Sequence, residues 1–248
     1  VGQALAMRNT VLYNIEQAVE MVSCAERERS LNIVIAGGGA AGIELAGAFS
    51  EMKNNIIPKD YPEFRPEDMN IYLIEGSDRL IGTMSGKTSA DSLDLLRKMG
   101  VEVLLGTRVT GFTDGAVVLH DGRTLPTRNY IWTSGVTVTA PEGMEKCERG
   151  GGGRIVTDQY LRVKGYTDIF AVGDASIQPT PENPNGYPQL ARPAIEQAQH
   201  VGDTLISLEK GRDEKPYIYT EYPVLVTVGR NKAFFEYGRF RLKGFIAW

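Results

Sequence analysis

Residues 37–42, with the sequence GGGAAG, have the composition of a loop that holds phosphate groups. Gly37, Gly39 and Gly42 fit the spacing G-x-G-x-x-G, in which each glycine has a physical role. The first permits a tight turn, the second lets the backbone approach a pyrophosphate, and the third lets a helix pack closely on a strand. We expect dinucleotide binding here rather than a purely structural turn, by the residues Gly37, Gly38, Gly39, Ala40, Ala41 and Gly42.

A strand and a helix flank this loop in the order that dinucleotide binding requires. The apolar, β-branched run Ile33–Ile35 leads into the glycines, and Leu45, Phe49 and Met52 then recur at i, i+4 and i+7. This change of period predicts a buried strand followed by an amphipathic helix, the first half of a βαβ unit. The helix points its unpaired N–H groups and its positive dipole end at the phosphates.

The second residue suited to this chemistry is Glu75, at the end of the predicted strand Asn70–Glu75. An acid at this place binds the adenosine ribose and repels a 2′-phosphate, so we expect NADH to be preferred over NADPH, with Arg79 the compensating cation nearby in sequence. A solvated carboxylate at a strand end is the alternative. Glu75 follows Gly42 by 33 residues, against the usual spacing of about 20. The difference is explained by Asn54–Met69, whose three prolines are expected to exclude a helix.

Composition limits the classes of protein that this sequence fits. Its 248 residues carry a net charge of −4, which argues against a nucleic-acid-binding surface over the whole protein. The two cysteines, Cys24 and Cys147, form no C-x-x-C pair, which suits a reducing compartment and excludes a dithiol centre within this sequence. His120 has no metal-ligand companion and is expected at the surface. Because the sequence starts with Val1 and stops within an aromatic-rich pattern, we expect it to be part of a longer protein.

The remaining pattern predicts an α/β protein in which a parallel, Rossmann-like sheet is interrupted by a β-meander. Two Asp-Gly turns, Asp114-Gly115 and Asp121-Gly122, predict the meander within residues 108–126. The run Gly150–Gly153 is interpreted as a flexible joint. Helices are predicted at 3–28, 88–99 and 190–209, and further strands at 101–105, 130–133, 154–163, 168–172 and within 217–245.

Four segments together resemble a known family: GGGAAGIELAG, IYLIEG with GVEVLLGTRVTGF, IWTSGV and YTDIFAVGDAS. They resemble the FAD- and NAD-binding pyridine nucleotide-disulfide oxidoreductase superfamily. Within it, they are most similar to the type II NADH dehydrogenases, the single-subunit NADH:quinone oxidoreductases. The resemblance covers nearly the whole sequence in the right order. It implies a respiratory, non-proton-pumping flavoprotein that passes hydride from NADH through FAD to a quinone.

The resemblance also implies roles for individual residues. The glycine loop holds the NADH pyrophosphate, Glu75 binds its ribose, and the backbone at Gly135 passes close to the dinucleotides. Glu44 lies near the contact of nicotinamide and flavin as the catalytic candidate, although it equally suits a carboxylate that only complements the helix dipole. Asp174 accepts a hydrogen bond from the FAD ribitol, and its neighbours in the expected flavin contact are Gly173, Gln189 and Leu190.

The implied domain order has four parts. Residues 1–30 form a leading helix of the FAD domain, 31–140 the NADH-binding domain, 141–210 the C-terminal part of the FAD domain, and 211–248 the start of a C-terminal β region. The family's upstream glycine motif for FAD is missing here. We therefore expect these residues alone to bind NADH but neither to retain FAD nor to turn over, and to pair the exposed strand 168–172 with something else, such as a second copy in a homodimer.

Two further departures concern the acceptor side. Arg192 and Glu196 stand where the family's quinone-side helix has neutral glutamines, and the family's amphipathic membrane-binding segment does not follow the aromatic stretch. Basic and aromatic residues alternate within 230–248, which suits either an anionic membrane surface or a solvated sheet face. The resemblance implies a peripheral position on the cytoplasmic face of the inner membrane.

Other functions remain open at this stage. A flavin-dependent reductase that passes electrons to a ferredoxin- or rubredoxin-like protein shares these motifs. A disulfide reductase is disfavoured because C-x-x-C is missing. A non-catalytic NADH-binding module differs from both enzymes by lacking turnover. The acceptor and the oligomeric state do not follow from the sequence.

Overall fold

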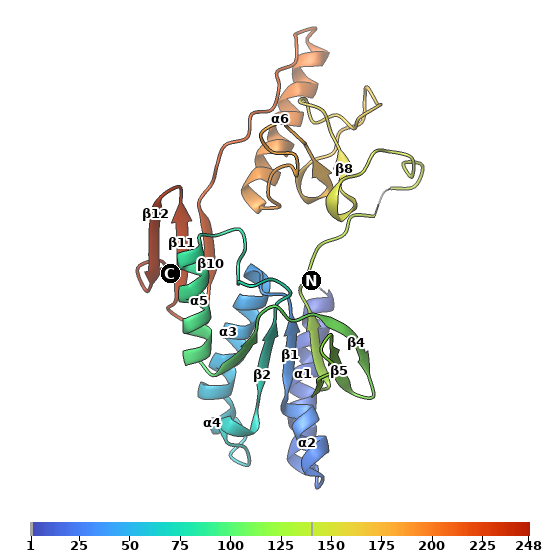
Figure 1. Cartoon of the computed structure of the whole chain (residues 1–248). Helices are drawn as coiled ribbons and strands as arrows, with labels where there is room; N and C mark the ends of the chain where they lie inside the picture. Colours follow the sequence, from blue (N-terminus) through green and yellow to red (C-terminus); the bar gives the residue numbers. More distant parts are fainter. Residues whose placement is uncertain (1, 140) are drawn as a thin grey trace. The chain divides into compact units, whose positions relative to one another are not determined.

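The computed structural model describes residues 2–139 and 141–248, which form two compact units (Figure 1). The first unit contains the chain up to Ser134 together with Pro223–Trp248, and the second is Gly135–Tyr222. These boundaries differ from the four predicted segments. The assignment of residues 1–30 and 141–210 to a flavin domain stays a prediction.

A parallel four-stranded sheet is the centre of the first unit, as the βαβ pattern predicts. Its order is β3-β2-β1-β7, and all neighbouring strands are parallel. The strands are β1 (Ile33–Ala36), β2 (Ile71–Ile74), β3 (Val101–Leu104) and β7 (Asn129–Trp132). Because parallel strands end at one edge, Gly37 and Glu75 follow neighbouring strands at the same edge of the sheet.

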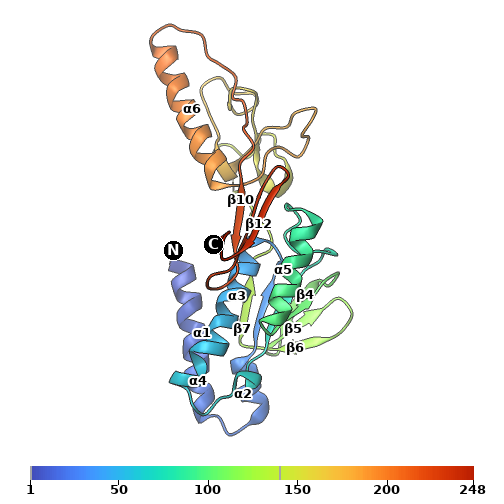
Figure 2. The same ribbon diagram turned by 90° about the vertical axis from the view of Figure 1, so that its left-hand side faces the viewer.

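The two faces of this sheet are covered by different elements (Figure 2). Ile33 and Ile35 face a large core with helices α1 (Gly2–Glu20), α3 (Ala40–Asn55) and α5 (Gly86–Lys98). Val34 faces the opposite side, where it packs with Val117 and Leu119. These two residues belong to the predicted meander, which consists of β4 (Val109–Thr113), β5 (Ala116–Leu119) and β6 (Thr124–Pro126). Asp114 and Gly115 form its first turn with φ of 51° and 71°.

Buried asparagines tie the amino-terminal ends of the strands together. Asn129 Nδ2 donates to the carbonyl oxygens of Ser30 and Asn32 at 2.8 and 3.1 Å, and Asn14 Nδ2 of α1 donates to Asn129 Oδ1 at 2.8 Å. Asn70 Nδ2 donates to Asn32 Oδ1 at 3.0 Å. Each amide thereby satisfies polar groups that burial would otherwise leave unpaired, and the shared bonds fix the register of β1, β2 and β7.

Two local predictions in this unit are wrong for identifiable reasons. The helix predicted at 3–28 is broken at Met21–Ser23 into α1 and α2 (Cys24–Leu31), because the Ser23 hydroxyl caps α2 by accepting the Glu26 N–H at 3.4 Å. The S-x-x-E spacing of Ser23 and Glu26 was the available signal. The prolines of 54–69 also do not exclude a helix, because Pro58 lies in the first turn of the short α4 (Ile57–Asp60).

The C-terminal segment forms an antiparallel sheet against α3. Its strands are β10 (Val224–Thr227), β11 (Ala233–Tyr237) and β12 (Phe240–Gly244), with Gly229 and Asn231 at positive φ in the turn between β10 and β11. The close approach depends on Gly47 of α3, where a Cβ would lie 2.5 Å from the Gly229 nitrogen. The absence of a side chain at Gly47 therefore lets this sheet pack on α3.

In the second unit, helix α6 (Ala191–Glu209) agrees with prediction, and the strands are shorter than predicted. Among the described residues of this unit, β8 (Ile155–Val156) and β9 (Ser176–Ile177) are the strands that pair in parallel. The strand predicted at 154–163 ends early because the Asp158 carboxylate accepts the N–H groups of Tyr160 and Arg162 and turns the chain. Residues 168–172 form no strand, since they pair only through one antiparallel bridge between Arg162 and Phe170.

The glycine run of this unit is not a free joint. Gly151–Gly153 form the 3₁₀ turn η2, in which the Gly152 carbonyl accepts the Val138 N–H at 2.9 Å. Gly152 and Gly153 have φ of 69° and 72°, so glycine serves a bonded turn here. Among the helices that the structure describes, none is long and apolar enough to cross a membrane.

One side chain from the C-terminal sheet caps a helix and gives a pH-dependent prediction. Glu236 of β11 accepts hydrogen bonds from the Ser85 N–H at 2.9 Å and from the hydroxyls of Ser85 and Thr88 at the start of α5. Burial alone would raise the pKa of Glu236, but these bonds outweigh it and lower the pKa from its ordinary value of 4.5. The ionised carboxylate therefore stabilises the folded state above the unfolded-state pKa, and this contribution is lost as pH falls through the folded-state pKa.

We predict that Glu236→Gln lowers the free energy of unfolding by about 1 kcal/mol near neutral pH, with the solvent screening of a partly exposed group taken into account. The difference from the unchanged chain shrinks as the pH is taken below about 4. Urea denaturation across this pH range measures both effects. The matched control is Glu102→Gln, at an exposed carboxylate on β3. Equal losses in both variants, or a Glu236→Gln effect that does not depend on pH, contradict the capping role.

Candidate functional site

The glycine loop at the end of β1 leaves no room for a side chain at Gly37 or at Gly42. Gly37 has φ of 119°, and a Cβ there would lie 2.6 Å from Ser134 Oγ. A Cβ on Gly42 would lie 1.8 Å from the carbonyl oxygen of Gly37. The start of α3 therefore lies directly on the loop, as the third glycine of the motif predicts.

The amino-terminal end of α3 is open to solvent and has no cap from a side chain. Gly39 is the N-cap residue without a side-chain hydrogen bond, and Gly39, Ala40 and Ala41 are exposed. A Cβ on Gly39 would meet nothing within 4 Å. The first N–H groups of this 16-residue helix thus face free space, which is the arrangement that binds an anion at a helix N-terminus.

Glu75 lies beside this loop and is held by three donors. Its Oε2 accepts the Gly38 N–H at 2.6 Å, and its Oε1 accepts the N–H and the hydroxyl of Ser77, each at 2.8 Å. Burial raises the pKa of Glu75, but the hydrogen bonds from Ser77 and Gly38 outweigh it and lower the pKa overall. The carboxylate is therefore ionised at neutral pH and joins the loop after β1 to the end of β2.

A pocket opens along this edge of the sheet, and it contains residues that the motif did not indicate. Arg108 and Trp132 contribute side chains to it next to Glu75. Trp132 is 60% exposed and its Nε1 donates to the Ser134 carbonyl at 2.6 Å. Arg108 follows β3 and reaches Gly76, at which a Cβ would lie 3.4 Å from Arg108 Cγ. The full lining is Ala36, Gly37, Ile74, Glu75, Gly76, Thr107, Arg108, Val109, Trp132 and Ser134.

Glu44, the catalytic candidate, makes a structural contact in this unit. Its Oε1 accepts the N–H and the hydroxyl of Thr227 at 3.3 and 3.1 Å, at the end of β10. The side chain is exposed. Glu44 therefore helps α3 to hold the C-terminal sheet, and its catalytic role stays a prediction.

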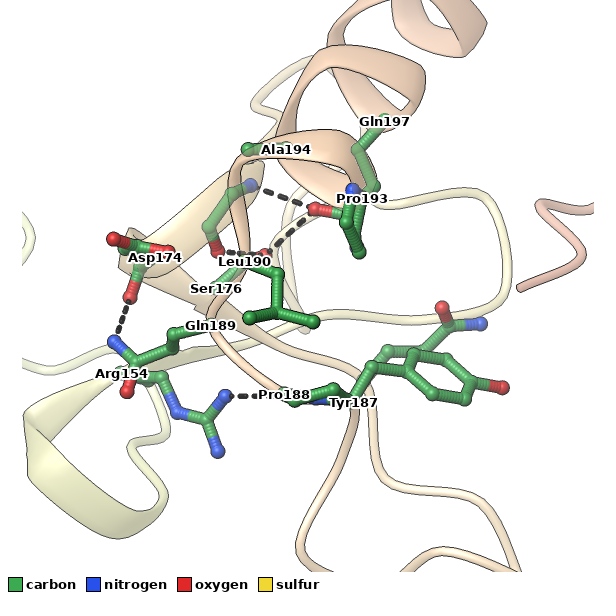
Figure 3. A pocket seen from close by; sticks show the side chains of 12 residues that line it. Arg154, Asp174, Ser176, Tyr187, Pro188, Gln189, Leu190, Pro193, Ala194 and Gln197 are labelled. Carbon is green, nitrogen blue, oxygen red and sulfur yellow. Dashed lines mark hydrogen bonds between the residues drawn. The ribbon is translucent and has the colours of Figure 1, made fainter. Parts of the chain in front are cut away.

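The second unit has its own pocket at the start of α6, which Figure 3 shows from close by. It brings together Gly173, Asp174, Gln189 and Leu190, which the sequence places on separate segments. Gln189 Nε2 donates to the backbone carbonyl of Asp174 at 3.0 Å, while the exposed Asp174 carboxylate makes no hydrogen bond with the described residues. Leu190 is the N-cap of α6 and supplies no side-chain cap.

Three residues of this pocket were not indicated by the sequence. Gln197 Oε1 accepts the Gly173 N–H at 2.6 Å, and Arg154 donates to the carbonyl oxygen of Tyr187 at 3.1 Å (Figure 3). Arg154 also donates to the carbonyl oxygen of Asn185 at 2.9 Å. Gln178 is 7% exposed, and its Oε1 has no hydrogen-bond partner among the described residues. A buried acceptor without a partner is costly, so a ligand N–H or O–H in this pocket would satisfy it.

The charged residues of α6 interact with each other. Arg192 Nε donates to Glu196 Oε1 at 3.1 Å, and the Tyr222 hydroxyl donates to Glu196 Oε2. Gly135 begins this unit with φ of 80° and open space at its Cα, so its backbone is accessible. In the residues that the structure describes, no cluster of three or more His, Cys, Asp or Glu side chains can hold a metal ion. His120 is exposed, and its Nδ1 accepts the Arg108 N–H at 3.2 Å.

Comparison with known proteins extends this description. The family model described as pyridine nucleotide-disulphide oxidoreductase matches residues 8–198. The type II NADH:quinone oxidoreductase NdhA of Mycobacterium tuberculosis is 28% identical over 261 residues, which cover 100% of this chain and 54% of that protein. A probable NADH dehydrogenase of Dictyostelium discoideum is 28% identical over 248 residues, which cover 99% of this chain and 54% of that protein. The chain thus spans about half the length of these curated relatives.

The fold itself is shared with a solved structure. NDH2 from Plasmodium falciparum in complex with NADH superposes with a TM-score of 0.86 at 16% identity, covering 98% of this chain and 65% of that one. At this level of identity the likeness shows the fold alone. The predicted fold class, a Rossmann-like α/β fold with a β-meander, is confirmed.

Alanine substitutions at Gly42 and Gly39 are predicted to have separable effects. Gly42→Ala lowers the free energy of unfolding by about 3 kcal/mol or more, because the new methyl group overlaps a backbone oxygen that cannot turn away. Gly39→Ala leaves stability within about 0.5 kcal/mol but weakens NADH binding by more than about tenfold, because the methyl group enters the space where a phosphate approaches. Thermal denaturation and NADH titration of both variants measure these effects. Unchanged NADH affinity in Gly39→Ala rules out the phosphate at this place.

Proposed function

This chain belongs to the pyridine nucleotide-disulphide oxidoreductase family, and we propose that it is the NADH-binding part, with a portion of the flavin-binding part, of a type II NADH:quinone oxidoreductase. The observation that carries the proposal is the open amino-terminal end of α3 beside an ionised Glu75. Donor N–H groups for a pyrophosphate and an acceptor for ribose hydroxyls lie next to each other there. The similarity to type II NADH:quinone oxidoreductases along the whole chain supports the reaction.

In this proposal, the residues of the first unit bind and orient NADH. The N–H groups of Ala40, Ala41 and Gly42 face its phosphates, Gly37 and Gly39 leave room for them, and Glu75 accepts from the adenosine ribose. The Gly38 N–H is used by Glu75, so this glycine positions the acid. Glu44 lies on the second turn of the same helix, where Thr227 holds its carboxylate in place.

The second unit fits a flavin by the same physical criteria. The uncapped start of α6 offers N–H donors, and Gln178 Oε1, which has no partner among the described residues, offers an acceptor. Gly173 lets its segment lie close to α6, since a Cβ there would lie 3.0 Å from Ala194 Cβ. We assign the Asp174 carboxylate as the acceptor of a hydrogen bond from an FAD ribitol hydroxyl. Gln189 and Leu190 are assigned to contacts with the flavin ring, and the Gly135 backbone to a close approach to the dinucleotides. FAD bound there would supply the hydride acceptor and pass electrons on, while the protein supplies position and electrostatics.

The acceptor side is proposed to be the start of α6. Arg192 and Glu196 form an ion pair at the positions where the family that this sequence resembles has neutral glutamines. The Tyr222 hydroxyl donates a hydrogen bond to the same Glu196 carboxylate. Arg192 also lies over the Tyr222 ring, with 5.8 Å from its guanidinium carbon to the ring centre. We propose a quinone as the acceptor, with an aromatic and charged surface beside it.

We further propose that the longer protein is peripherally attached to the cytoplasmic face of the inner membrane. The support is a set of exposed aromatic and aliphatic side chains in the C-terminal segment, namely Tyr237, Phe240, Phe245, Ile246 and Trp248. Arg239 is exposed among them. Basic and aromatic side chains together favour an anionic lipid surface.

The experiment that tests the function uses the longer protein that contains this chain. Its visible spectrum is expected to show a flavin band that NADH bleaches and that a soluble quinone analogue restores. A flavin band that NADH leaves unchanged rules out NADH dehydrogenase activity. If only a ferredoxin-like protein restores the bleached band, the electron acceptor is that protein and not a quinone. The 248-residue chain alone is expected to bind NADH without retaining FAD.

Asp174→Ala in the longer protein is expected to weaken FAD retention and leave NADH affinity within about twofold. The physical reason is the loss of a charge-assisted hydrogen bond, about 1.5–3 kcal/mol, to one cofactor only. The flavin-to-protein absorbance ratio after gel filtration, with and without added FAD, measures the change. Asp168→Ala, at an exposed carboxylate six positions earlier, is the matched control. Full FAD occupancy in Asp174→Ala contradicts the assigned role.

Glu75→Gln is expected to weaken NADH binding by about 1–2 kcal/mol, roughly 5- to 30-fold, because an ionised acceptor of the ribose is replaced by a neutral one. NADPH binding is expected to change less or to improve, since the like charge is removed. Titration of NADH and of NADPH against the 248-residue chain, with and without the substitution, gives the ratio of the two affinities. An unchanged ratio of the two affinities shows that Glu75 does not contact the ribose.

A further inference from the structure

We propose that Arg108 recognises the 2′-phosphate of NADPH, so that the pocket beside Glu75 accepts both nicotinamide nucleotides. This inference rests on the proposed binding of NADH and adds a specificity-determining residue to that site. The motif alone predicts that Glu75 excludes NADPH. The structure adds a cation at the same place.

The position of Arg108 carries the proposal. It follows β3, the neighbour of β2, and therefore reaches the same edge of the sheet as Glu75. An ideal Cβ on Gly76 would lie 3.4 Å from Arg108 Cγ and 3.5 Å from its Nε, so the side chain runs alongside the residue that follows Glu75. In a dinucleotide fold this is where the 2′ position of the adenosine ribose lies, and a nearby arginine accommodates the phosphate there.

The backbone of Arg108 is fixed while its side chain is available. Its N–H donates to His120 Nδ1 at 3.2 Å, and its carbonyl oxygen accepts the His120 N–H at 2.9 Å. These bonds join it to the end of β5. The guanidinium itself forms no hydrogen bond or ion pair with any residue that the structure describes, and the residue is exposed. A planar, always charged donor group is thus left for a ligand, and such a group suits two oxygens of a phosphate.

Glu75 is less repulsive to a phosphate than its charge alone suggests. Both of its oxygens accept hydrogen bonds, one from Gly38 and the other from Ser77. The carboxylate stays ionised, but the dipoles of these donors offset part of its negative potential, and the Gly38 bond holds one oxygen on the glycine loop. The cation of Arg108 offsets the remaining like-charge repulsion.

The arginine nearest to Glu75 in sequence does not serve this purpose. Arg79 Nη2 donates to the carbonyl oxygen of Gly82 at 2.7 Å, so the loop that carries Arg79 holds one edge of its guanidinium, and Arg79 does not line the pocket. Arg79 is therefore a matched control for Arg108, since both are exposed arginines near Glu75. The two differ in whether the guanidinium is free in the pocket.

The test measures dissociation constants of NADH and NADPH for the 248-residue chain by calorimetry. We expect the unchanged chain to bind NADPH within about tenfold of NADH. Arg108→Ala is expected to weaken NADPH binding by about 10- to 100-fold and NADH binding by less than about threefold, as expected for one charge-assisted phosphate contact. Arg108→Lys is expected to restore part of the loss, and Arg79→Ala to leave the ratio of affinities unchanged. The NADPH affinity is expected to fall with added salt more steeply than the NADH affinity.

The outcomes separate this inference from the proposed function. If neither nucleotide binds a folded chain, the NADH site itself is wrong. If NADH binds and NADPH binds more than about 100-fold more weakly, the role of Arg108 is wrong and the NADH site stands. Equal losses for both nucleotides in Arg108→Ala, or a larger NADPH loss in Arg79→Ala, also overturn the assignment. The NADH affinity of each variant serves as the check that it has folded.

Discussion

The close approach of α3 to its neighbours is the constraint on which the rest of the first unit depends. At Gly42 the helix lies against the carbonyl oxygen of Gly37, and one and a half turns later, at Gly47, it lies against the backbone of Gly229. No side chain fits at either contact. The same helix therefore presents its unpaired N–H groups at the carboxyl edge of the sheet and receives the C-terminal sheet, so the donor groups and the packing contact belong to one rigid element.

Where the sequence predicts structure well, the determining interactions are local. The glycine loop, the Asp-Gly turns of the meander and helix α6 each follow from residues within a few positions of one another. The strands of the second unit were overestimated because apolar runs favour strands, while Asp158 turns the chain through bonds of its own carboxylate. The break before α2 has a local signal too, in the spacing of Ser23 and Glu26.

Some residues of the candidate site are predictable from the sequence and others are not. Glu75 is predictable because its place after β2 is part of the motif. Arg108 and Gln178 are not predictable, since their roles depend on segments that meet only in the folded chain. Arg108 lies 33 positions after Glu75 in sequence and shares its pocket. Gln178 points to a ligand only in the folded structure, where its Oε1 is buried without a hydrogen-bond partner among the described residues. The sequence does not show which glutamine will be buried in this way.

The pairing of β1 with β7 has a consequence for how the protein folds during synthesis. Ile33 pairs with Asn129, 96 positions later, and Glu44 bonds to Thr227 across 183 positions. Contacts of such separation form late, because loop closure must precede them. The ribosome therefore makes β1, α3 and β2 well before β7 can cover the edge of β1, and it makes the whole of Gly135–Tyr222 before β10 can reach Gly47. For that interval the apolar strand Ile33–Ala36 has one unpaired edge, and an unpaired edge is a site at which another strand can pair wrongly.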